Sequence, residues 1–120
     1  MEETCTVKYK SRRFAIDVIN LYKDLSENRK EYVLSKQVLR SGTSVGANIV
    51  EAEMAISKRE FLSKMYIAFK ECCETEYWLE LLYETRYVED TPFVALMSKC
   101  KELERMLSSI TKSSKESLEK

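Results

Sequence analysis

The chain has 120 residues, and its 20 basic and 20 acidic side chains give a formal net charge of zero. This balance gives no global sign of a nucleic-acid or membrane binder. Glycine and proline are scarce, with two and one residues, and the common residues are strong helix formers, so the composition indicates an all-α protein without strands. We expect one all-α domain over residues 1–120, large enough to bury a core without metal or disulfide support.

Apolar residues recur at helical spacing along four segments. The segments predict helices at about residues 11–25, 31–55, 58–86 and 92–111, followed by a frayed tail at 112–120. Ser57 and Glu60 have the spacing of a capping box at the start of the third helix, and Pro92 fits the first position of the fourth. Short connections between long helices predict an antiparallel up-down-up-down four-helix bundle.

Residues 40–53, R-S-G-T-S-V-G-A-N-I-V-E-A-E, are unusually rich in small side chains. Serine, glycine and asparagine are also common in loops, but the apolar residues keep helical spacing through this run, which favours a helix. Each glycine weakens a helix by about 1 kcal/mol relative to alanine. We therefore expect Gly42, Gly46 and Ala47 to mark close packing against a neighbouring helix.

A row of polar side chains follows one flank of the second helix, and acidic side chains follow the facing flank of the third. We expect these residues to form a buried polar layer that fixes the register of the two helices. The layer consists of Arg40, Ser44, Asn48, Glu51, Glu71 and Glu74. Within it, Arg40 is expected to meet Glu71 or Glu74.

Glu71 and Glu74 also invite an enzymatic interpretation, because carboxylates at i and i+3 on a helix can share a magnesium ion. All-α nucleotide pyrophosphohydrolases need a second acidic pair, but Glu51 and Glu53, at i and i+2, do not face each other. The absence of histidine removes di-iron motifs and the usual base for a cysteine or serine nucleophile. We predict no enzymatic activity, no cofactor and no small-molecule substrate.

The four cysteines are Cys5, Cys72, Cys73 and Cys100. They form no C-x-x-C pair, and without histidine this spacing removes the usual zinc ligand sets, so we expect no metal site. We expect reduced thiols that pack as small core residues. The sequence shows no apolar leader and no stretch of about 20 apolar residues, which predicts a cytoplasmic protein without membrane contact.

The strongest basic cluster precedes the first predicted helix and has Tyr9 interleaved in it. It consists of Lys8, Lys10, Arg12 and Arg13. Such a cluster is compatible with phosphate contact. The alternative is that these basic residues are simply exposed to solvent, as is usual at the start of a chain. Acidic residues gather along the third helix, so the basic starts in a ring of copies could face the acidic ends of their neighbours.

Three segments resemble a known family: R-S-G-T-S-V-G-A-N-I-V-E-A at 40–52, S-K-R-E-F at 57–61 and I-A-F-K-E-C-C-E-T-E-Y-W-L at 67–79. In these segments the chain is similar to the bacterial S23, or 23S rRNA intervening-sequence, proteins, over about residues 14–109. The resemblance implies an antiparallel four-helix bundle that assembles into a closed ring, most often a pentamer. Members are encoded within insertions in large-subunit ribosomal RNA genes, and similar proteins accompany reverse transcriptases.

Two functions remain open at this point. The first is a non-enzymatic, homo-oligomeric interaction or scaffold protein, in which the small-residue face and a second apolar stripe on the third helix bury against neighbouring copies. That stripe consists of Leu62, Tyr66, Phe69 and Cys73. The alternative is a nucleic-acid-binding accessory protein, with rRNA or retroelement-associated RNA or DNA as its ligand. In this alternative a ring multiplies a weak basic patch by avidity.

Overall fold

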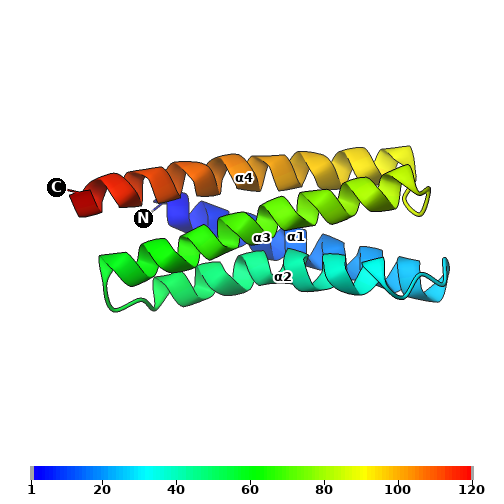
Figure 1. Ribbon diagram of the computed structural model, residues 1–120, viewed down its shortest axis with the longest axis horizontal. Helices are drawn as coiled ribbons and strands as arrows, with labels where there is room; N and C mark the ends of the chain where they lie inside the picture. Colours follow the sequence, from blue (N-terminus) through cyan, green and yellow to red (C-terminus); the bar gives the residue numbers. More distant parts are fainter. Residues whose placement is uncertain (1, 120) are drawn as a thin grey trace.

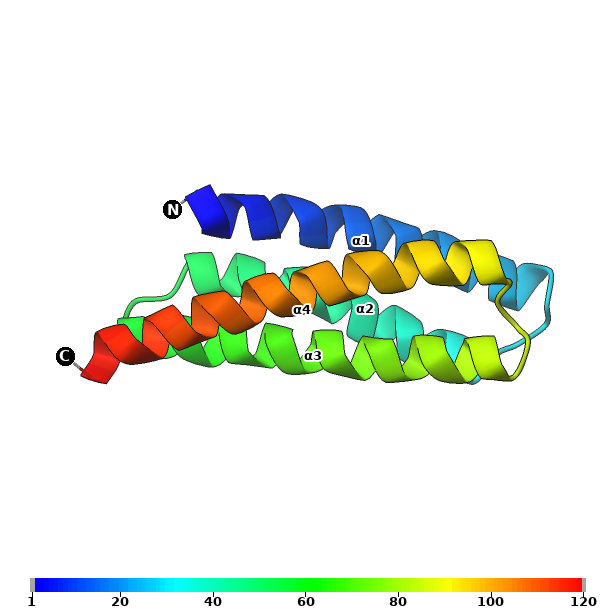
Figure 2. The same cartoon turned by 90° about the horizontal axis from the view of Figure 1, so that it is seen from above.

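The computed structural model describes residues 2–119, and that range holds four α-helices and no strand. The helices are α1 (Glu2–Glu27), α2 (Leu34–Glu53), α3 (Lys58–Glu84) and α4 (Asp90–Glu119). Successive helices run in opposite directions, and α1 packs against both α2 and α4 to close the bundle (Figures 1 and 2). The predicted all-α, antiparallel up-down-up-down bundle is confirmed. None of the four helices is long and apolar enough to cross a membrane.

Each helix contributes one apolar stripe to a continuous core that runs along the bundle. The stripes form because residues three and four apart lie on one helix face. Burying one large apolar side chain contributes about 1.5–3 kcal/mol, so these stripes supply most of the favourable free energy. The largest fully buried side chains include Phe14, Leu25, Ile49, Met65, Leu79, Leu82, Leu103 and Leu107.

The two outer helices are longer than the sequence predicted. α1 starts at Glu2 instead of about residue 11, because Val7 and Ser11 continue its stripe and are almost completely buried. α4 continues to Glu119, so the segment 112–119, expected to fray, is helical. Ser114 and Leu118 are half-buried there and extend the inward face by one more turn.

Helix starts depend on side chains that satisfy free backbone amides. α2 begins three residues later than expected because the Glu31 carboxylate accepts from the amides of Val33, Leu34 and Ser35, at 3.2, 3.0 and 2.6 Å. At α3, Ser57 Oγ accepts from the Glu60 amide at 3.0 Å, as the capping box predicts. The α4 helix begins two residues before the predicted proline position.

The glycines of α2 lie against α1. A Cβ atom added at Gly42 would lie 2.8 and 2.9 Å from the two Cγ atoms of Val18, and one added at Gly46 would lie 3.2 Å from Ser11 Oγ. Real side chains do not approach as closely as the Gly42 distances. The absence of a side chain at Gly42 therefore sets the separation of α1 and α2.

We expect Gly42→Ala to lower stability although alanine is the better helix former. Overpacking against buried Val18 costs about 1–3 kcal/mol, and the gain in helix propensity returns about 1 kcal/mol. The net loss is therefore up to about 2 kcal/mol, measurable by urea denaturation. In a Val18→Ala background the same change should become neutral or stabilising. Equal losses in both backgrounds would contradict a steric cause.

Candidate functional site

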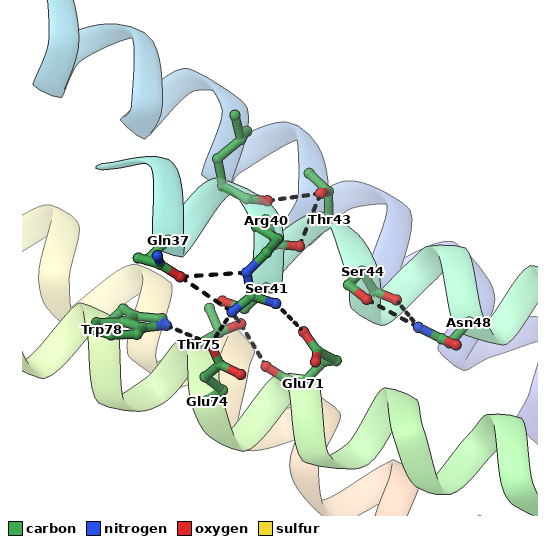
Figure 3. Close-up of polar contacts among 11 residues, drawn as sticks. Gln37, Arg40, Ser41, Thr43, Ser44, Asn48, Glu71, Glu74, Thr75 and Trp78 are labelled. Carbon is green, nitrogen blue, oxygen red and sulfur yellow. Dashed lines mark hydrogen bonds and ion pairs between the residues drawn. The ribbon is translucent and has the colours of Figure 1, made fainter. Parts of the chain in front are cut away.

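Arg40 joins α2 to α3 across the interface between these two helices (Figure 3). Its guanidinium forms ion pairs with Glu71, at 3.1 Å from Nη1 to Oε2, and with Glu74 through Nη2. Trp78 Nε1 donates to Glu74 Oε2 at 2.9 Å, and Gln37 Oε1 accepts from the guanidinium at 3.4 Å. The structure therefore brings Arg40, Glu71 and Glu74 of the expected polar layer together.

The remaining members of that layer lie further along α2 and do not join this network. Asn48 Nδ2 donates to the carbonyl oxygen and Oγ of Ser44, at 2.9 and 3.0 Å, so these two residues satisfy each other (Figure 3). Glu51 pairs with Lys64 at 2.7 Å. The side chains of Glu51 and Arg40 are 59% and 50% exposed. The prediction of a buried layer is therefore wrong for Arg40 and Glu51, which are exposed at the solvent rim of the α2–α3 interface. The other four members, Ser44, Asn48, Glu71 and Glu74, are half-buried.

The polar contact that is buried between α2 and α3 is a pair of hydroxyls. Thr75 Oγ1 lies 2.8 Å from Ser41 Oγ and 2.8 Å from the Glu71 carbonyl oxygen, and both side chains are fully buried. The sequence analysis missed this pair. Ser41 lies between Val38 and Val45 at helical spacing, which is the signal that could have placed it in the core.

Ala47 does not take part in the close packing expected for the small-residue run. It is exposed, whereas Gly42 is buried and Gly46 is half-buried against α1. The reason is its place on the helix: Ala47 follows Gly46 by about 100° and so points away from the bundle. The small-residue run therefore covers two faces of α2, one packed against α1 and one exposed to solvent.

The basic cluster of α1 is divided among different partners. Lys8 pairs with Glu53 of α2 at 2.8 Å, and Lys10 pairs with Glu102 of α4 at 2.6 Å. Arg12 and Arg13 are exposed, and neither forms an ion pair with any residue from 6 to 119. Two of the four expected phosphate contacts are therefore already neutralised within the bundle.

Two exposed apolar features lie at the end of the bundle that holds the α2–α3 turn and the end of α4 (Figure 1). The first, here called the end patch, consists of Ala47, Val50, Met54 and Ile56. Exposure rises along it from 48% at Val50 through 78% at Met54 to 94% at Ile56.

The second feature, here called the end groove, is a hollow of about 610 Å³ between the first turns of α3 and the last turns of α4. Apolar side chains form much of its wall, and basic side chains border it. The lining residues are Arg59, Leu62, Ser63, Tyr66, Phe69, Ser108, Thr111, Lys112 and Lys115. Three members of the predicted second stripe of the third helix, Leu62, Tyr66 and Phe69, therefore line this groove.

A family model described as 23S rRNA-intervening sequence protein matches residues 3–109. The chain belongs to this family. It is also similar to a crystal structure of a protein of unknown function from the S23 ribosomal protein family of Bacteroides thetaiotaomicron VPI-5482. The two chains are 49% identical with a TM-score of 0.90, over 92% of this chain and 98% of the other. No curated protein matches the chain.

For this 23S rRNA-intervening sequence family member, we expect the hydroxyl pair to matter more for stability than the ion pairs beside it. Arg40→Ala should cost at most about 1 kcal/mol, because exposed ion pairs are screened by water. Thr75→Val should cost about 1–3 kcal/mol, because it leaves Ser41 without its partner in the core. Urea denaturation measures both, and a larger loss for Arg40→Ala would contradict the assignment.

Proposed function

We propose that this protein is a non-enzymatic, homo-oligomeric scaffold in which copies pack side by side into a ring. The observation that carries the proposal is the presence of an apolar end patch and an apolar end groove on one small bundle. Contiguous exposed apolar surface is uncommon on soluble monomers and marks interaction sites. An exposed apolar patch and an apolar hollow on different helices of one molecule fit a head-to-tail contact between copies.

Basic side chains border the end groove, namely Arg59, Lys112 and Lys115. Glu51 lies on the helix of the end patch and is 59% exposed although it pairs with Lys64. A contact that places the end patch of one copy in the end groove of the next would offer Glu51 a second basic partner. Such complementarity steers association and sets orientation.

The positions of the two features favour a closed ring over a filament. Both lie at the same end of the bundle, so neighbours can pair without sliding along the bundle axis. A head-to-tail contact without such a shift closes on itself when the rotation between copies divides a full turn. A pentamer is the ring size that the family resemblance implies, and we adopt it here.

The ion pairs at Arg40 support a non-enzymatic role. Glu71 and Glu74 both form ion pairs with the same guanidinium and are therefore not a free carboxylate pair that awaits a magnesium ion. We further place the protein in the cytoplasm, where the thiols of Cys72, Cys73 and Cys100 would stay reduced.

The most exposed residue of the end patch provides the direct test. Ile56→Asp should shift the protein from its oligomer to the monomer in sedimentation velocity, because it places a charge in an apolar contact without touching the core. Val94→Asp is the matched control, since Val94 is 64% exposed near the opposite end of the bundle. An oligomer that is unchanged in Ile56→Asp, or lost equally in both variants, would rule out the end patch as the interface.

Nucleic-acid binding is the second candidate, and the exposed Arg12 and Arg13 are the observation that favours it. In a ring these arginines would repeat on every copy, which raises a weak affinity by avidity. We expect Arg12→Glu/Arg13→Glu to abolish retention of a mixed RNA and DNA oligonucleotide pool at low salt while the oligomer persists. Binding that survives in this variant, or that resists high salt, would exclude this electrostatic mode.

A further inference from the structure

Two cysteines from different helices meet in the core of the bundle. Cys72 of α3 and Cys100 of α4 lie with their Sγ atoms 3.8 Å apart, and both side chains are fully buried. Each Sγ also lies 3.4 Å from the backbone carbonyl oxygen of the other residue. The two helices therefore approach very closely here, which only small side chains permit.

A carboxylate completes this cluster from the solvent side. Glu104 lies one helical turn after Cys100, and helical side chains lean toward the N-terminus, which brings its carboxylate back over that cysteine. Glu104 Oε2 is 3.8 Å from Cys100 Sγ, and one ligand atom from each of Cys72, Cys100 and Glu104 lies within 4.8 Å of the others. The half-buried Glu104 gives the two buried sulfurs a polar route to solvent.

The spacing of these atoms matches the coordination geometry of zinc. A tetrahedral ion with Zn–S bonds of about 2.3 Å holds two sulfurs about 3.8 Å apart. The observed Sγ–Sγ distance is 3.8 Å, which equals the sulfur separation that such an ion requires. We propose that Cys72, Cys100 and Glu104 bind a divalent, thiol-preferring cation such as Zn²⁺, with water at the fourth position.

The surrounding charges fit a bound cation. Binding would release the two thiol protons, and two thiolates with one carboxylate around a divalent ion leave a net charge of −1. Lys101 lies nearby and pairs with Glu76 at 2.8 Å. The Glu104 side chain is half-buried beside the two sulfurs, so a bound cation would replace part of the solvation that its carboxylate has lost.

The sequence predicted no metal site, because its four cysteines form no C-x-x-C pair and it has no histidine. Cys72 and Cys100 lie 28 residues apart. Zinc ligand motifs are recognised from neighbours within one segment, and here the ligands come from two antiparallel helices. The adjacent Cys73 is exposed and belongs to another face of α3.

Cobalt binding under reducing conditions tests the proposal on the full-length protein. Titration with Co²⁺ should give thiolate-to-cobalt charge-transfer absorption that saturates at one equivalent per chain and disappears when Zn²⁺ is added. Cys72→Ser and Cys100→Ser should each abolish the signal, whereas the matched control Cys73→Ser should keep it. Glu104→Gln leaves the core intact and should weaken cobalt affinity at least about tenfold.

Several outcomes would overturn the site. They are the absence of charge-transfer absorption in the wild-type protein, its persistence in Cys72→Ser or Cys100→Ser, or its loss in Cys73→Ser. Circular dichroism of each variant shows whether a loss of signal reflects unfolding. If a serine variant is unfolded, the wild-type titration and Glu104→Gln decide the matter.

Discussion

The close approach of α2 to α1 at Gly42 sets the rotation of α2, and the rest of the surface follows from it. With no side chain at this position, Val18 of α1 packs directly on the α2 backbone. One flank of α2 therefore packs against α1. The other flank, which carries Arg40, Ser44 and Asn48, faces α3. The side opposite the core, which carries Ala47, Val50 and Met54, is left in solvent.

The fold could be predicted from the sequence because each helix carries its own periodic apolar stripe, and such a pattern is local. The capping box at Ser57 and Glu60 is equally local, and its serine half forms as the spacing predicts. The length of α1 was underestimated because Lys8 and Lys10 were assigned to a basic chain start that precedes the helix, whereas α1 begins at Glu2. The burial of Val7 depends on the other helices, which no local pattern reports.

The candidate site was harder to predict because it depends on how deep each side chain lies. Helical spacing indicated that Arg40 faces α3, and the structure brings it to Glu71 and Glu74. Spacing could not tell a buried layer from a solvent rim, since that depends on how closely two helices pack. The contact of Cys72 with Cys100 could not be predicted for the same reason, because the two cysteines come together only in the folded bundle.

The 20 basic and 20 acidic residues balance in number, and half of the basic cluster is already paired within the bundle. Lys8 and Lys10, the first half of the basic cluster, form ion pairs with Glu53 and Glu102 of neighbouring helices. The end patch and the end groove expose apolar side chains. The self-association that we propose would bury these side chains, and burial of apolar area would be its driving force.

The most direct measurement is native mass spectrometry of the wild-type protein across a range of low concentrations. Self-association through the end patch and end groove predicts a single closed oligomer, a pentamer, that persists on dilution without larger species. A monomer at all concentrations, or an open series of growing oligomers, would contradict a ring built from these surfaces.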